Sequence, residues 1–187
     1  TRSQFQVERD TIVLLGEPTS ELGASEYLAR IHDVVAGAPP ACDLDAERAL
    51  VDALLEAIQG GVVRSAHDCS DGGLAVALAE CCIMNREEQH GARIDLSHWR
   101  ELPLRALLFG EAQGRVVVST SMPDTVAGIA QKHGIPARVI GHVGAVGDAL
   151  QITTAGGRIT ASLDRLDDAF HETLPRIMST PVGASIQ

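Results

Sequence analysis

The stretch from residue 65 to 74, SAHDCSDGGL, brings an apolar strand, an acidic turn and an apolar helix together. If the strand ends near His67 and the helix begins near Gly72, the free N–H groups of the first helical turn attract anions. Two adjacent glycines would let a ligand approach the backbone closely. The stretch is therefore a candidate site for a small anionic ligand. Its candidate residues are His67, Asp68, Ser70, Asp71, Gly72 and Gly73.

The two carboxylates of this turn oppose direct binding of a phosphate. Each charge pair costs about 4 kcal/mol at a separation of about 4 Å and an effective dielectric constant of about 20. A phosphate would therefore need Mg²⁺, with Asp68 and Asp71 as oxygen ligands. Alternatively, Ser70 or Asp71 caps the helix and the glycines only shape a turn. The spacing of the residues leaves both interpretations open.

A second set of polar residues lies in the stretch LFGEAQGR, residues 108–115, directly before an apolar strand. Glu111 and Gln113 are two positions apart, so in an extended segment they project to the same side. Together they could bind amide or hydroxyl groups of a ligand. The alternative is an exposed polar edge. Gly110 and Arg115 complete this candidate set.

The histidines and cysteines favour structural roles. His67 and His90 have no partner at helical spacing, so we expect hydrogen-bonded structural histidines rather than metal ligands. The four cysteines include no C-x-x-C pair, which predicts reduced and mostly buried thiols. Cys69 could be reactive beside a helix N-terminus, but Asp68 and Asp71 would raise the pKa of its thiol.

Strands and helices alternate along the chain and must position these residues. Asp43 is placed to cap a helix that Gly60-Gly61 ends. The apolar residues from Leu74 to Met84 predict a helix buried in the domain or against a partner. The predicted strands span 11–15, 62–67, 115–119 and 137–143, with a short helix in 22–31, a helix from 123 to 134 and a hairpin of 151–153 with 158–160.

Two apolar stripes make more specific predictions about the helices. The helix capped by Asp43 should bury one apolar stripe. A last helix, capped by Ser162, should carry the other stripe, and Pro175 should bend or shorten this helix. The first stripe is Leu50, Val51, Leu54, Leu55 and Ile58, and the second is Leu163, Leu166, Phe170, Leu174 and Ile177.

These elements predict one α+β domain with helices packed on a mixed sheet. With 187 residues, of which 45% are hydrophobic, the chain can bury a sizeable core. We expect the domain to occupy residues 1–179 and the residues 180–187 to form a loose tail. No repeat or linker divides the chain.

Charge and hydropathy exclude several classes of partner. The formal charge of −10, with Lys132 as the only lysine, disfavours nucleic acid, whose phosphates require a basic surface. No apolar run approaches the roughly 18 residues needed to cross a bilayer. The N-terminal residues lack the apolar segment of a signal peptide. We therefore expect a soluble, cytoplasmic protein.

Four stretches resemble one enzyme family in their order and spacing. They are GE at 16–17, ELGASEYL at 21–28, SAHDCSDGGLAVALAE at 65–80 and LFGEAQ at 108–113. Together they are similar to phosphoribosylformylglycinamidine synthase, specifically to the last C-terminal, AIR-synthase-like domain of its large PurL-type subunit. The resemblance covers residues 5 to 179.

This resemblance implies an ATP-dependent amidotransferase of purine biosynthesis. The family uses ATP and Mg²⁺ to phosphorylate the formamide oxygen of formylglycinamide ribonucleotide, and ammonia then displaces the phosphate. The implied partners are the remaining domains of the large subunit, a glutaminase subunit and a small PurS-type subunit. The catalytic histidine and the main ATP and Mg²⁺ ligands of the family lie in N-type domains. The resemblance therefore implies an inactive fragment with no catalytic residue of its own.

Two departures from the family pattern limit what can be transferred. Ala112 stands where the first C-type domain of the family has a serine between its Glu and Gln, and Arg9 stands where the family usually has glycine. We expect the candidate residues to line a second, pseudo-symmetric pocket. Two alternatives are a sister ATP-dependent enzyme, such as thiamine-monophosphate kinase or selenophosphate synthetase, and a scaffold without a ligand. The segment 21–28 argues against the sister enzymes.

Overall fold

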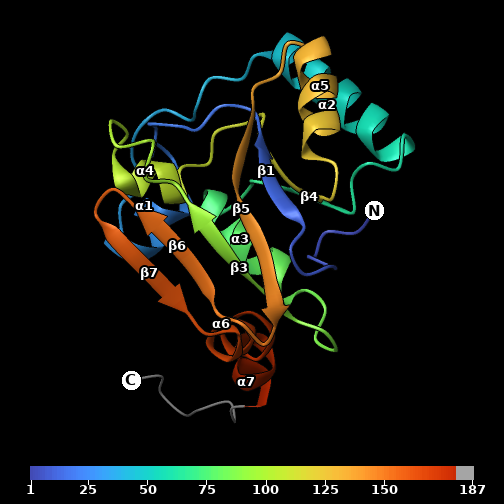
Figure 1. Cartoon of the computed structure of the whole chain (residues 1–187). Helices are drawn as coiled ribbons and strands as arrows, with labels where there is room; N and C mark the ends of the chain where they lie inside the picture. The colour runs from blue at the N-terminus through green and yellow to red at the C-terminus, as the bar shows by residue number, and fades with distance from the viewer. Residues whose placement is uncertain (180–187) are drawn as a thin grey trace.

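The computed structural model of the chain describes residues 1–179, where seven strands form a single sheet (Figure 1). The strands are β1 (Thr11–Leu15), β2 (Ser65–Asp68), β3 (His90–Asp95), β4 (Val116–Thr120), β5 (Ala137–Val146), β6 (Leu150–Thr154) and β7 (Gly157–Ala161). Their order is β2-β4-β1-β5-β3-β6-β7. Only the β3–β6 pair is parallel among these, so the sheet is mixed, as predicted. The predicted tail at 180–187 lies outside the described residues.

Helices cover the middle of the sheet on both faces. Within residues 1–179 they are α1 (Glu26–His32), α2 (Leu44–Gln59), α3 (Gly73–Ile83), α4 (Leu104–Phe109), α5 (Pro123–Lys132), α6 (Leu163–His171) and α7 (Thr173–Ser179). Figure 1 shows α2 and α5 side by side at one end of the molecule. The predicted α+β fold, with helices packed on a mixed sheet, is confirmed.

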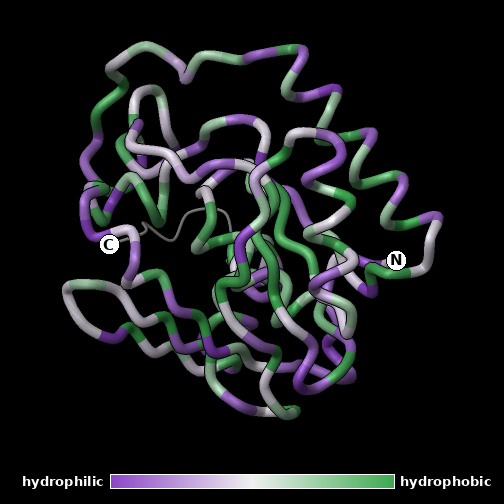
Figure 2. Tube along the Cα trace, turned by 45° about the horizontal axis from the view of Figure 1, so that its top comes forward, coloured by the Kyte–Doolittle hydropathy of each residue, from purple (hydrophilic) through white to green (hydrophobic). Residues whose placement is uncertain are grey.

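Alternating side chains of β1 pack into two separate hydrophobic cores, one on each face of the sheet. Ile12 and Leu14 pack with α3, whereas Val13 and Leu15 pack with α2 and α5. Successive residues of a strand point to opposite faces, so a strand covered on both faces is apolar throughout. Figure 2 shows the apolar strands in the centre of the trace. The predicted burial of the α3 segment is confirmed, with Leu74 fully buried.

The α2 helix forms at the predicted place with a different buried face. Asp43 Oδ1 accepts hydrogen bonds from the backbone N–H groups of Asp45 and Ala46, and Gly60 follows the last turn. Val51 and Leu55 are about half exposed, so the predicted stripe is only partly correct. Small side chains let the helix approach the sheet closely on the adjacent face. The buried residues of α2 are Leu50, Ala53 and Ala57.

The predicted last helix is two helices. Pro175 lies in the first turn of α7, and its ring would clash with the carbonyl of residue 171 in a continuous helix. The helix α6 ends at Glu172, so the predicted apolar stripe does not continue into α7. Leu174 and Ile177 are exposed. Ser162 holds the N-cap position of α6, but its side chain makes no capping hydrogen bond.

Other boundaries differ in smaller ways. The strand predicted from Val62 begins at Ser65, because Val62 and Val63 pack into the core beside α2 before the pairing with β4 starts. The elements β3 and α4 have no counterpart among the predicted ones. Within residues 1–179, no helix is long and apolar enough to cross a membrane.

Candidate functional site

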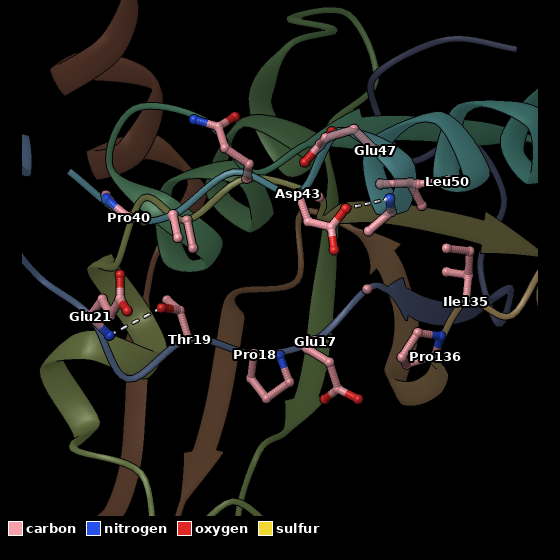
Figure 3. A pocket seen from close by; sticks show the side chains of 16 residues that line it. Glu17, Pro18, Thr19, Glu21, Pro40, Asp43, Glu47, Leu50, Ile135 and Pro136 are labelled. Atoms are coloured by element: carbon pink, nitrogen blue, oxygen red, sulfur yellow. Dashed lines mark hydrogen bonds between the residues drawn. The ribbon is translucent and has the colours of Figure 1, made fainter.

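The loop of residues 110–114, between α4 and β4, forms one wall of a cleft of about 290 Å³ (Figure 3). The end of β1 and the first turn of α2 form the facing walls. Gln113 from the second candidate set contributes to the lining. The other lining residues include Gly16, Glu17, Pro18, Thr19, Glu21, Pro40, Ala41, Asp43, Glu47, Leu50, Ala112, Gly114, Ile135 and Pro136.

The cleft is acidic. Figure 3 shows the side chains of Glu17, Glu21, Asp43 and Glu47 around it, and its described lining contains no lysine or arginine. A cluster of carboxylates attracts cations and accepts hydrogen bonds from hydroxyl groups, and it repels an unpaired phosphate. The cleft therefore suits a polyhydroxyl group, a cation or a phosphate that carries its own metal ion.

Two glycines shape the floor of this cleft. Gly16 has a φ of +93°, and a Cβ built on it would lie 1.9 Å from the carbonyl oxygen of Gly114. No other residue allows the end of β1 to approach the loop so closely. The pair Gly16-Glu17 from the first resembling stretch thus meets the loop from the last one.

Glu111 joins the starts of two helices and is not among the residues that line the cleft. Its Oε1 atom accepts hydrogen bonds from the backbone N–H of Gly72 at 2.8 Å and of Glu26 at 2.9 Å. Gln113 lines the cleft and Glu111 does not, and residues 110–115 form no strand. The anion at the start of α3 is thus a carboxylate of the protein itself.

Gly72 and Gly73 have the backbone conformation that a tight turn requires. Their φ angles are +79° and +67°. A Cβ on Gly73 would lie 2.5 Å from the carbonyl oxygen of Gly110, so the helix start packs directly on the loop. Neither Ser70 nor Asp71 caps α3 with its side chain, which corrects that alternative: Gly72 is the N-cap and Glu111 supplies the acceptor.

The remaining polar residues of the turn are on the surface. Asp68, Ser70 and Asp71 are exposed. Within residues 1–179, no group of three or more His, Cys, Asp or Glu side chains is arranged to hold a metal ion. The Mg²⁺ site at Asp68 and Asp71 stays a prediction.

His67 is a largely buried link between β2 and α3. Its Nε2 atom lies 3.1 Å from Glu80 Oε2, and its Nδ1 atom lies 2.8 Å from the carbonyl oxygen of Asp68. The hydrogen bond to Glu80 raises the pKa of His67, although burial acts in the opposite direction. His90 is buried, with Nδ1 at 3.1 Å from the Gly144 carbonyl oxygen. Both histidines have the structural hydrogen bonds that their spacing predicted.

Cys69 lacks the environment of a reactive thiol. Burial raises its pKa to about 11, and the nearby charge of Asp68 acts in the same direction, whereas Arg115 lowers it. A thiol with this pKa is protonated at neutral pH. Cys81 and Cys82 are also buried and Cys42 is exposed, so the prediction of mostly buried thiols is confirmed.

Arg115 holds the backbone of the loop of residues 110–114 through hydrogen bonds from its side chain. Its side chain is buried, its Nη2 group donates to the carbonyl oxygen of Gly110, and its Nε group donates to that of Ala112 at 3.2 Å. These two carbonyls flank Glu111. Arg115 therefore orders the backbone of the loop and does not line the cleft.

Several cleft residues were absent from the candidate set. Glu47 lies on the first turn of α2, and the sequence pattern predicts Asp43 only as the cap of this helix. Glu17 and Glu21 belong to the resembling stretches, which was the only signal for them. These four carboxylates come together only in the folded chain, because two of them follow β1 and the other two lie at the start of α2.

This fold and site define a protein class. The chain belongs to the family described as AIR synthase related protein, C-terminal domain, whose profile matches residues 8–152. The fold class predicted from the resemblance is therefore confirmed.

Within this family, the chain is similar to PurL, a subunit of phosphoribosylformylglycinamidine synthase. The PurL of Moorella thermoacetica is 38% identical over 178 residues, which are 94% of this chain and 23% of that protein. The PurL of Thermobifida fusca is 40% identical over 178 residues, with 94% and 22% covered. The predicted resemblance to PurL is confirmed, and the chain spans about a quarter of the length of these relatives.

Solved structures agree on the fold. Thermotoga maritima PurL complexed with FGAR superimposes with a TM-score of 0.72 at 22% identity, covering 89% of this chain and 29% of that one. The same protein complexed with ATP gives a TM-score of 0.68 at 22% identity, with 89% and 27% covered.

Proposed function

We propose that this chain is the C-terminal AIR-synthase-like part of a PurL-type subunit. The whole subunit converts formylglycinamide ribonucleotide to formylglycinamidine ribonucleotide, using ATP and ammonia. The observation that carries this proposal is the identity of 38% to PurL over 94% of the chain. Such extended similarity favours the synthase over the sister ATP-dependent enzymes.

The acidic cleft is the proposed ligand pocket of this part. Its volume is about 290 Å³, and a neighbouring domain of the subunit would complete it. ATP together with Mg²⁺ fits the lining, because the metal ion offsets the charge of the phosphates and carboxylates bind it through oxygen. Two Thermotoga maritima PurL structures are complexed with ATP and with ADP, which supports a nucleotide for this family.

The proposed partners follow from the same relatives. One related structure is of PurLQS from Thermotoga maritima. By analogy, this chain would work with the remaining domains of its large subunit, a glutaminase subunit and a small PurS-type subunit, in the cytoplasm. Alone it would be inactive, because the catalytic histidine of the family belongs to an N-type domain.

A chimeric subunit tests this function. The matched region of Moorella thermoacetica PurL is replaced by residues 1–187, and ATP-dependent formation of the amidine product is measured with ammonia as the nitrogen donor. We expect activity from the chimera and none from the truncated relative or the isolated chain. An inactive but folded chimera, or turnover by the isolated chain, would contradict the proposal.

A scaffold role is the second candidate, and one observation favours it. The backbone N–H of Gly72, at the start of α3, already donates to the carboxylate of Glu111. Calorimetric titration of the chimera with ADP and Mg²⁺ separates the two roles. Binding that is lost in Glu47→Gln supports the pocket, whereas full activity without any effect of Glu47→Gln supports the scaffold.

A further inference from the structure

We propose that Glu111 is a positioning residue of the acidic cleft. Its carboxylate fixes the first turn of α1 to the N-cap of α3, and α1 in turn sets the position of residues 33–43, which supply part of the cleft wall. The positioning rests on contacts within this chain. Only its consequence for a bound nucleotide rests on the proposed function.

The α1 helix is attached to the domain by few contacts. It contains no buried residue. Tyr27 stacks on Phe109 with ring centroids 4.9 Å apart and an interplanar angle of 14°, and the backbone N–H of Glu26 donates to Glu111 Oε1. Phe109 and Glu111 belong to one short segment, so this segment holds the start of α1 in place.

A carboxylate is well suited to this position. The start of a helix carries partial positive charge, and a charged acceptor makes a stronger hydrogen bond than a neutral one. Glu111 Oε1 accepts from N–H groups at two helix starts, those of Glu26 and Gly72. The carboxylate of Glu26 itself is engaged with Arg30 Nε at 2.8 Å. Among the contacts named here, Glu111 is therefore the acceptor that joins the start of α1 to the start of α3.

The position of α1 is transmitted to the cleft through residues 33–43. Backbone hydrogen bonds join Ala24 N–H to the Ala36 carbonyl at 2.9 Å and Val34 N–H to the Leu28 carbonyl at 3.1 Å. The same segment then supplies Pro40 and Ala41 to the cleft lining. A displacement of α1 would therefore move this wall.

Arg115 keeps Glu111 in the orientation that this role needs. Its buried guanidinium group holds the carbonyls of Gly110 and Ala112, on either side of Glu111. Gln113, two residues further along, lines the cleft. The same loop thus anchors α1 through one side chain and faces the cleft with another.

Amide hydrogen exchange of the 187-residue chain tests the anchoring. The variants are Glu111→Ala, Glu111→Gln and, as a control for lost charge at an exposed turn, Glu87→Ala. In Glu111→Ala we expect exchange at the amides of Glu26 and Gly72 to accelerate about tenfold or more, since each loses a charge-assisted hydrogen bond. Glu111→Gln keeps an acceptor oxygen and should show a smaller acceleration. Unchanged protection at both amides would overturn the proposal.

Two further readouts separate positioning from general destabilisation. The amide resonances of Ala41 and Gln113 should shift in Glu111→Ala, return toward the wild-type values in Glu111→Gln and stay unchanged in Glu87→Ala. Exchange in the core strand β4, at Val117 and Val118, should not change. Acceleration throughout β4, or unshifted resonances of Ala41 and Gln113, would refute the positioning role.

Nucleotide affinity connects the cleft to the proposed function. In the chimeric subunit, Glu111→Ala should weaken binding of ADP with Mg²⁺ about fivefold to tenfold, with Glu111→Gln in between. Undiminished affinity in Glu111→Ala would overturn the functional consequence. If the wild-type chimera binds no nucleotide, the proposed ligand fails, and the amide readouts alone decide whether Glu111 positions the wall.

Discussion

His67 Nε2 lies 3.1 Å from Glu80 Oε2, which joins the end of β2 to the middle of α3 across the acidic turn. The two residues belong to one of the stretches that identify the family, and the pair spans the turn that first suggested a ligand site. Both side chains are mostly buried, so the link stabilises the geometry at which α3 leaves the sheet.

This pair makes stability depend on pH. The pKa of His67 is raised above its ordinary value, chiefly by the hydrogen bond to Glu80. A raised pKa means that the folded protein holds the proton more tightly, so the pair's full contribution is present below about pH 6.5 and is lost as pH rises through the raised pKa. Glu80→Gln should therefore lower the melting temperature more at pH 6 than at pH 8.5. An equal loss at both pH values would contradict an ionic contribution, and His67→Gln should give the same pH trend.

Gly73→Ala should destabilise the protein by more than the cost of its backbone conformation. Gly73 has a φ of +67°, and a Cβ would lie 2.5 Å from the Gly110 carbonyl oxygen. Gly61 has a φ of +69° with nothing within 4 Å, so Gly61→Ala is a matched control for conformation alone. We expect about 1–2 kcal/mol of lost unfolding free energy for Gly61→Ala and about 1–3 kcal/mol more for Gly73→Ala. Urea unfolding measures both, and equal losses would show that the helix start tolerates a methyl group.

Leu78→Ala should leave a cavity in the core. Leu78 is fully buried in α3, among the apolar side chains between this helix and the sheet. Removing three buried carbons there should cost about 2–5 kcal/mol of unfolding free energy. Leu174, which is 68% exposed on α7, is the control, and Leu174→Ala should change the same quantity by less than about 0.5 kcal/mol.

The four cysteines should differ in reactivity toward DTNB at neutral pH. Cys42 is exposed, whereas burial raises the pKa of the Cys69 thiol to about 11 and that of the Cys82 thiol to about 12. One thiol per native chain should react quickly, and Cys42→Ser should abolish that fast phase. In urea, where the protein is unfolded, all four thiols of the wild-type chain should react, and three should react in Cys42→Ser. A fast phase that survives Cys42→Ser would show that another cysteine is accessible.

Local sequence patterns were sufficient for much of the fold. The apolar run of β1, the capped helix α2 and the hairpin of β6 and β7 all form where the pattern predicted them. In each case a short-range cause decides: a cap, a glycine stop or a two-residue turn. The sequence also carried the family resemblance, since the four motifs depend only on residue order.

Tertiary structure decided the elements whose stability comes from neighbours. The β3 strand has a mixed, short sequence and becomes a strand because β5 and β6 supply partners on both sides. Val51 and Leu55 belong to an apolar stripe by sequence, yet the alanines of α2 face the sheet. Propensity cannot choose between two apolar faces, because the choice depends on how closely the packed layers approach.

The site shows the same division. Residue types and spacing picked out the turn at 65–74 and the loop at 110–115 as the places with possible chemistry. Only the folded chain separates Gln113, in the acidic cleft, from Glu111, at the starts of α1 and α3. The partners of Glu111 are 39 and 85 positions away in the sequence, and contacts at such separation depend on the packing of whole elements.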